Sequence, residues 1–256
     1  MTAKNLSDPQ VQGFYDSYWP ANVPDYERTS NHVLSLLPEK RPFGHTLDAG
    51  CGTGVCSLAL AGQAERVTAV DASFGSLATA QDLARNHKVE NIRFQQADLL
   101  ALPFADGEFD LVWSWGVIHH TVAPRQAFSE LVRVLAPSGY LILAVYLRTA
   151  LTPIHETIRN RCLRMNEARK QRFLNRVAKT TDIFSTITGK RPQRDDNPLT
   201  TSKIEDWYFV PEKHFFSIPE IRRMFSDANL EFELLSPRTG RFKSTSNFIV
   251  RGKKLP

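Results

Sequence analysis

The chain has 256 residues, of which 42% are hydrophobic and 23% charged, as is ordinary for a globular protein. Its length suits one α/β domain with an insertion, or two small domains. No apolar run approaches the ~18 residues that a membrane span needs, and the N-terminus lacks the apolar core of a secretory signal. We therefore expect a protein without a membrane span.

Cysteine and charge patterns narrow the class of protein further. None of the three cysteines forms a Cys-x-x-Cys pair, so we predict neither a metal site nor a disulfide framework, and a cytoplasmic location. The net charge of +5 is unevenly distributed: residues 148–194 hold twelve Lys or Arg against three acids. That segment is therefore a different kind of surface from the rest of the chain.

The predicted elements begin with a helical region at residues 9–38, interrupted by prolines. Strands and helices then alternate. Strands are predicted at 46–48, 66–71, 92–98, 109–114 and 139–146, with helices at 55–64, 76–87 and 124–135. This alternation predicts a parallel sheet with helices on both faces.

Beyond this region the alternation stops. Residues 149–206 are polar, basic and helical by period, with a loop around 189–192. A helix is predicted at 218–229, followed by strands at 231–235 and 247–251. The late strands return the chain to the sheet.

The most informative run is Leu47–Gly54, where Asp48 leads into a Gly-x-Gly-x-Gly turn between a predicted strand and helix. Glycines allow close approach of the backbone to a ligand, and the following helix offers free N–H groups. Dinucleotide-binding folds use a similar turn, so this run alone does not distinguish a dinucleotide-binding protein from a protein that binds another nucleoside cofactor. Asp71 and Asp98 end the next two predicted strands, at the edge where α/β sheets bind ligands. A carboxylate at Asp71 can accept from both hydroxyls of a ribose.

Together these residues resemble class I S-adenosylmethionine-dependent methyltransferases of the small-molecule type, the type 11 methyltransferase domain. The resemblance covers about residues 40–146. It rests on Leu47–Gly54, Val70–Ser73, Gln96–Leu99 with Leu102–Phe104, Phe109–Val112 with Val117–His120, and Leu135–Leu141. It implies an α/β fold: a doubly wound, seven-stranded, mostly parallel, Rossmann-like sheet with a helical substrate lid.

The resemblance also implies a domain plan. Residues 1–38 would form an N-terminal helical cap and 39–147 the core that binds S-adenosylmethionine. Residues 148–216 would form the basic helical insertion or substrate lid, and 217–256 the C-terminal helix and closing strands, the last of them antiparallel.

The family implies a role for each cofactor-binding candidate. The glycines Gly50, Gly52 and Gly54 would pass beneath the methionyl part, Asp48 would orient its amino group, and Asp71 would hold the ribose hydroxyls. Asp98 would meet the adenine amino group with Leu99 against the ring, and Trp115 or Gly116 would lie along the cofactor. The remaining candidates are Cys51, Thr53, Ala72, Ala97 and His120, with Cys51 a small filler and not a nucleophile.

Methyl transfer from a sulfonium is an in-line displacement that needs alignment more than acid–base machinery, and a base only where the acceptor loses a proton. The catalytic candidates are His119, His214, Tyr15 and Tyr208. Each has a plainer interpretation. His119 can pack or cap, His214 and Tyr208 lie in an aromatic run that can pack a lid, and Tyr15 can anchor the N-terminal helix.

The predicted function is methyl transfer to an O, N or C atom of a small molecule, an anionic or aromatic acceptor being favoured, with S-adenosylhomocysteine as product. Two alternatives stay open: an RNA- or protein-modifying methyltransferase that uses residues 148–194, and a cofactor-binding protein without catalysis. One observation disfavours a nucleic-acid substrate. Enzymes that methylate the amino groups of nucleic-acid bases have Asn/Asp-Pro-Pro-Tyr after the fourth strand, whereas this chain has Trp113–Gly116 there. The sequence leaves the oligomeric state open.

Overall fold

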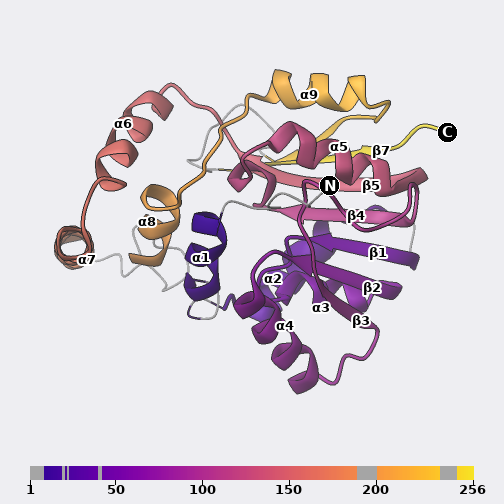
Figure 1. Ribbon diagram of the computed structural model, residues 1–256, viewed down its shortest axis with the longest axis horizontal. Helices are drawn as coiled ribbons and strands as arrows, with labels where there is room; N and C mark the ends of the chain where they lie inside the picture. Colours follow the sequence, from indigo (N-terminus) through magenta and orange to yellow (C-terminus); the bar gives the residue numbers. More distant parts are fainter. Residues whose placement is uncertain (1–8, 19–20, 22, 40–41, 189–200, 237–246) are drawn as a thin grey trace, which may run out of the picture. The chain divides into compact units, whose positions relative to one another are not determined.

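The computed structural model describes residues 9–18, 21, 23–39, 42–188, 201–236 and 247–256 (Figure 1). The chain divides into two compact units: Met1–Arg148 with Glu212–Pro256, and Thr149–Pro211. The predicted loop at 189–192 lies outside the described residues. No helix in the described ranges is long and apolar enough to cross a membrane.

A seven-stranded sheet forms the first unit, with the strand order β3-β2-β1-β4-β5-β7-β6. Its strands are β1 (Phe43–Ala49), β2 (Ala64–Asp71), β3 (Ile92–Gln96), β4 (Phe109–Trp115), β5 (Leu135–Tyr146), β6 (Glu233–Ser236) and β7 (Asn247–Lys253). The first five pair in parallel, whereas β7 runs antiparallel to both β5 and β6. The predicted doubly wound, mostly parallel sheet is confirmed.

Helices cover both faces of this sheet (Figure 1). The first unit contains α1 (Pro9–Tyr18), α2 (Tyr26–Leu36), α3 (Val55–Ala61), α4 (Phe74–Asn86), the 3-10 turn η1 (Ile118–His120), α5 (Pro124–Val134) and α9 (Ile218–Asp227). Local signals explain several starts. The Ser73 side chain caps α4 by accepting from Ser76 N–H, Ser217 caps α9 in the same way, and Pro124 opens α5.

Several boundaries differ from the sequence prediction, and two of the differences have a clear structural cause. Helix α3 ends at Ala61, because Gly62 closes it and β2 already begins at Ala64. Strand β5 begins at Leu135, four residues before the predicted start at Gly139, because Leu135 pairs with Phe109 ahead of a register shift in β4. A pairing partner 26 residues away cannot be seen in local periodicity.

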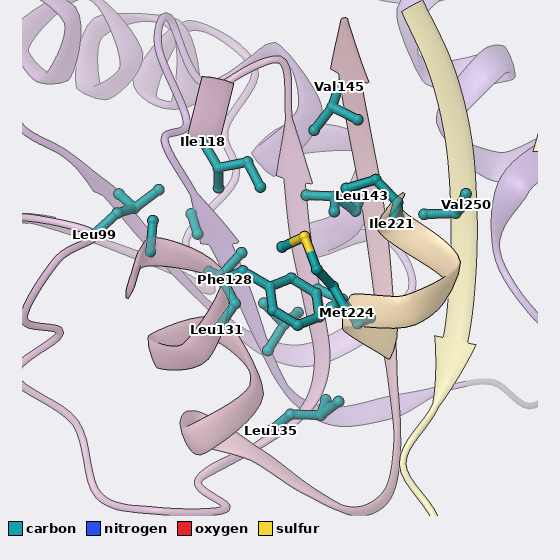
Figure 2. Packing of buried hydrophobic residues seen from close by; sticks show 14 of the residues in the cluster. Leu99, Ile118, Phe128, Leu131, Leu135, Leu143, Val145, Ile221, Met224 and Val250 are labelled. Carbon is teal, nitrogen blue, oxygen red and sulfur yellow. The ribbon is translucent and has the colours of Figure 1, made fainter. Parts of the chain in front are cut away.

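The core has one layer on each face of the sheet. Leu143 and Val145 of β5 point towards α5 and α9, where they meet Phe128, Ile221 and Met224 (Figure 2). The residues that alternate with them along β5, Ile142 and Ala144, face the layer that contains side chains of α2 and α3. Strands of a parallel sheet are buried on both faces, which explains their nearly continuous apolar sequence.

The second unit consists of α6 (Thr152–Cys162), α7 (Glu167–Thr188) and α8 (Thr201–Tyr208), with α8 packed against the other two. Lys170 of α7 forms an ion pair of 3.1 Å with Glu205 of α8. The predicted helical character of 149–206 is therefore seen in the described part of that segment, and its role as a substrate lid stays a prediction.

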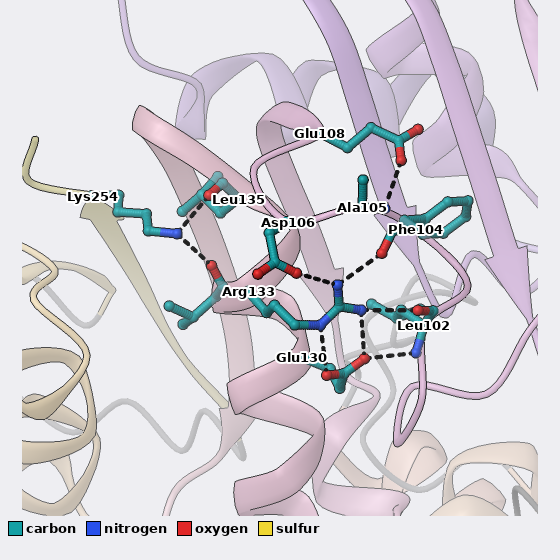
Figure 3. A network of polar contacts seen from close by, with 10 residues as sticks. Leu102, Phe104, Ala105, Asp106, Glu108, Glu130, Arg133, Leu135 and Lys254 are labelled. Carbon is teal, nitrogen blue, oxygen red and sulfur yellow. Dashed lines mark hydrogen bonds and ion pairs between the residues drawn. The ribbon is translucent and has the colours of Figure 1, made fainter.

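Arg133 of α5 fixes the loop between β3 and β4 (Figure 3). Its guanidinium donates to the carbonyls of Leu102 (2.9 Å) and Phe104 (2.7 Å) and to the carboxylates of Asp106 (2.8 Å) and Glu130 (2.8 Å). Glu130 in turn accepts from the Leu102 N–H at 2.8 Å. One side chain thus satisfies backbone groups of a loop that has no regular structure of its own.

We expect Arg133→Met to lower the free energy of unfolding by about 2–3 kcal/mol, because two carbonyls and two carboxylates lose a charged donor. Urea denaturation measures this change. Arg125→Met on the same helix is the control, since its pair with Glu220 is exposed and is worth less than about 1 kcal/mol. Equal effects of the two substitutions would contradict the role given to Arg133.

Candidate functional site

The glycine turn follows β1 and uses left-handed backbone that favours glycine. Gly50, Gly52 and Gly54 have φ values of 82°, 52° and 77°. A Cβ on Gly50 would lie 2.4 Å from the side chain of Val117, and one on Gly54 would lie 2.7 Å from Ala80 Cβ. The turn therefore needs glycine for both conformation and space, and it lies at the carboxyl edge of the sheet.

Asp71, at the end of β2, holds this turn in place. Its Oδ2 accepts from Gly52 N–H at 2.9 Å, and its Oδ1 accepts from Ser73 N–H at 2.9 Å. Burial raises the pKa of the carboxyl, and these hydrogen bonds oppose the rise. Because each carboxylate oxygen has two lone pairs, both oxygens retain the capacity to accept a hydroxyl group.

Asp98 follows β3 and offers a buried acceptor. Its Oδ1 accepts from Leu100 N–H at 2.8 Å, whereas its Oδ2 is buried and has no hydrogen-bond partner among the described residues. Such an oxygen is costly unless a ligand donates to it, and the amino group of adenine is a donor of the right kind. The neighbouring Leu99 packs into the core beneath the loop (Figure 2).

Gly116, after β4, borders open space. Its φ is 76°, and a Cβ placed on it would meet no heavy atom of the described residues within 4 Å. Trp115 beside it points towards the face of the sheet covered by α2, where it stacks on Trp113 and meets the edge of His32. Of the two residues predicted to lie along the cofactor, Gly116 is the one with space above it.

Asp48 is enclosed beneath the turn. Its Oδ2 accepts from Ser57 Oγ at 2.6 Å, and the residue is 1% exposed. Burial raises the pKa of this carboxyl to about 7, against an ordinary value of 3.8. The sequence did not identify Ser57, although its position one turn into the helix after the glycines was a signal.

The remaining cofactor candidates surround the same turn. Cys51 and Thr53 are buried, and burial raises the pKa of the Cys51 thiol well above its usual range, as suits a filler and not a nucleophile. Ala97 N–H donates to Asp71 O at 3.1 Å, and the Ala72 carbonyl accepts from Gln12 Nε2 at 3.0 Å. These residues shape the loops that carry the acids.

Helix α1 reaches the same edge. Ser73 Oγ donates to Asp16 at 2.6 Å, so α1 is joined to the loop that follows Asp71. Tyr15 lies with its ring centroid 5.6 Å from that of His120. The sequence suggested Tyr15 but not Asp16, whose partner is 57 residues further along the chain.

The histidines of η1 form a buried cluster with the end of β5. His119 is 0% exposed, and neither of its ring nitrogens has a hydrogen-bond partner among the described residues. Its ring centroid lies 3.9 Å from that of Tyr146 and 4.3 Å from that of His120. Burial, together with the nearby cation of Lys213, lowers the pKa of His119 well below its usual range, so the ring is neutral.

Residues 212–216 lie against this cluster. His214 N–H donates to the His119 carbonyl at 2.8 Å, and His120 Nδ1 donates to the Glu212 carbonyl at 2.9 Å. The ammonium of Lys213 lies 4.1 Å from the ring centroid of Tyr146 and 5.7 Å from that of Phe215. The sequence did not single out Lys213, although a cation inside an aromatic run was a visible signal.

Tyr208 lies in the second unit. Its Oη is 2.8 Å from His155 Nδ1, and burial raises its pKa. The structure thus brings together Tyr15, His119 and His214 in the first unit and gives Tyr208 a partner in the second. In the described residues, no group of three or more His, Cys, Asp or Glu could hold a metal ion.

Known proteins are similar to the part of the chain that contains these strand ends. Residues 47–143 match the family model of a methyltransferase domain. An uncharacterized protein of Synechococcus sp. is 32% identical over 202 residues, which are 75% of this chain and 48% of that relative. The tocopherol O-methyltransferase of Arabidopsis thaliana is 35% identical, covering 56% and 39% of the two chains.

The malonyl-[acyl-carrier protein] O-methyltransferase of Enterobacter lignolyticus is 34% identical, covering 64% of this chain and 60% of the relative. The chain therefore spans about half the length of the curated relatives it matches. Among solved structures, the YcgJ protein of Bacillus subtilis has a TM-score of 0.59 at 18% identity, covering 91% of this chain and all of that one. At this identity the likeness shows the fold alone.

The raised pKa of Asp48 makes stability depend on pH. Between its ordinary value of 3.8 and about 7, the folded protein binds a proton that the unfolded chain releases, so stability falls as pH rises through this window. In the unmodified protein, Asp48 should lower the free energy of unfolding by about 2–3 kcal/mol between about pH 5 and about pH 8, and we expect Asp48→Asn to abolish this decrease. Urea unfolding at both pH values measures it.

The exposed Asp227→Asn on α9 is the control and should leave the pH dependence unchanged. If Asp48→Asn shows the same fall in stability as the unmodified protein, the carboxyl is not held protonated by burial.

Proposed function

Residues 47–143 form the domain of class I S-adenosylmethionine-dependent methyltransferases, and from this premise we propose that the chain transfers a methyl group to an O, N or C atom of a small molecule. S-adenosylmethionine is the methyl donor of this family. The observation that carries the proposal is the row of Asp48, Asp71 and Asp98 at three neighbouring strand ends around a glycine turn. When bound, the cofactor supplies an electrophilic methyl on its sulfonium.

Each acid has a distinct part in holding the cofactor. Asp71 accepts the ribose hydroxyls with the lone pairs that the N–H groups of Gly52 and Ser73 leave on its two oxygens. The Oδ2 of Asp98, which has no partner among the described residues, accepts the adenine amino group. Asp48, once ionised, attracts the ammonium of the methionyl part. The open space at Gly116 accommodates the part that carries the sulfur.

The strand order supports a position for the acceptor. Adenine at β3, ribose at β2 and the methionyl part at β1 form a series that brings the sulfur next to β4. The next strand is β5, whose end carries Tyr146 beside His119. The acceptor therefore binds over the ends of β4 and β5, and the neutral His119 can take a proton from an O–H or N–H acceptor.

The relatives favour a small-molecule acceptor. Two of them are named for tocopherol and for 27-O-demethylrifamycin SV. The catalytic roles of Tyr15 and His214, and that of Tyr208 in the second unit, remain proposals, as does the cytoplasmic location. A cofactor-binding protein without catalysis would bind S-adenosylhomocysteine equally well and transfer no methyl group.

The cofactor part of the proposal is tested by calorimetric titration with S-adenosylhomocysteine. We expect Asp71→Ala to weaken binding about a hundredfold and Asp98→Ala about tenfold, because charged or buried hydrogen bonds to the nucleoside are lost. Asp82→Ala on α4 removes an exposed acid paired with Arg85 and should bind normally. Unchanged affinity in both site variants, each folded by circular dichroism, would refute the assignment.

Exposed arginines on α6, on α7 and in the turn between them favour a second candidate, modification of RNA; they are Arg161, Arg164, Arg169 and Arg172. With a small-molecule acceptor, we expect no retention of a structured RNA in a gel shift at about 50 mM salt. Retention that weakens with salt and is lost when these four arginines are replaced by serine would favour the RNA-modifying activity instead.

A further inference from the structure

Lys213 is a buried cation at the acceptor end of the proposed site. The residue is 9% exposed, yet it carries an ammonium group that lies over the face of Tyr146 at 4.1 Å. Tyr146 ends β5, and on the same ring lies His119. The face of an aromatic ring attracts a cation, so the Tyr146 ring helps to fix the position of this ammonium group.

His119 adds unsatisfied polar atoms to the same place. Both its ring nitrogens are buried without a hydrogen-bond partner in the part of the chain that the structure describes. Buried polar atoms in proteins are almost always paired, so two on one ring mark a position where a ligand supplies the partner. A neutral imidazole offers one N–H donor and one acceptor nitrogen.

The two groups together match a carboxylate. An ammonium and an imidazole N–H are two donors with one positive charge between them, and a carboxylate presents two acceptor oxygens with one negative charge. The neighbouring His214 side chain is 37% exposed, and its Nε2 lies 3.7 Å from a carboxylate oxygen of Glu212. An amide of the same shape offers one acceptor oxygen and no charge.

We infer that Lys213, with His119, binds a carboxylate group of the methyl acceptor. This inference rests on the proposed function, because it takes the ends of β4 and β5 as the acceptor site. It defines the substrate class as carboxylic acids. Lys213 selects these acids against their neutral analogues.

The test uses the full-length protein saturated with S-adenosylhomocysteine. Ligand-detected NMR measures binding of benzoate, phenylacetate and cinnamate, each against its primary carboxamide. We expect at least one acid to bind tenfold or more tightly than its amide, since hydrogen bonds to charged groups are worth about 1.5–3 kcal/mol. Lys213→Met should abolish the preference, and Lys213→Arg should retain most of it.

Lys253→Met is the matched control. Lys253 also lies over a tyrosine of β5, Tyr140, at 6.0 Å, but near the middle of that strand, six residues before Tyr146. It should leave the preference for acids unchanged. Absence of any preference in the unmodified protein, or its survival in Lys213→Met, would overturn the inference.

The two proposals fail separately. If the unmodified protein does not bind S-adenosylhomocysteine, the proposed function is refuted. Normal binding of S-adenosylhomocysteine with equal affinity for acids and amides would refute only the role of Lys213.

Discussion

Two hydrogen bonds to one carboxylate hold the functional edge together. Asp71 accepts from the glycine turn after β1 with one oxygen and from the loop before α4 with the other. The turn is also held by the Val70 carbonyl, which accepts from the N–H groups of Gly50 and Cys51 at 2.8 and 2.9 Å. The loop before α4 in turn receives Asp16 of α1. Asp71 therefore links the turn to the loop that caps α4 and contacts α1.

Charge is distributed unevenly along this edge. The ends of β1, β2 and β3 present buried acids, whereas the end of β5 presents the ammonium of Lys213. S-adenosylmethionine carries positive charge at its sulfonium and amino group, which suits the acidic side. An acceptor with the opposite charge suits the basic side. The edge thus favours opposite charges on the two partners whose atoms must meet in line.

Much of the fold could be predicted from the sequence, because the signals were local. An acid stands at or just after the end of each of the first three strands, as Asp48, Asp71 and Asp98. The spacing of the glycines in the turn can also be read from the sequence alone. The acceptor side could not be predicted equally well. Lys213 meets Tyr146 from 67 positions away, and only three-dimensional packing brings them together. The complete burial of His119 was likewise invisible, since no local pattern distinguishes a buried imidazole from an exposed one.

The network around Arg133 has a consequence for how the cofactor binds. The loop between β3 and β4 begins with the residues after Asp98, and Arg133 holds the carbonyls of Leu102 and Phe104 in fixed positions (Figure 3). The conformational entropy of this loop is therefore lost when the chain folds and not when a nucleoside arrives. In the proposed site, adenine would meet a loop that is already ordered, so no binding free energy would be spent on ordering that loop.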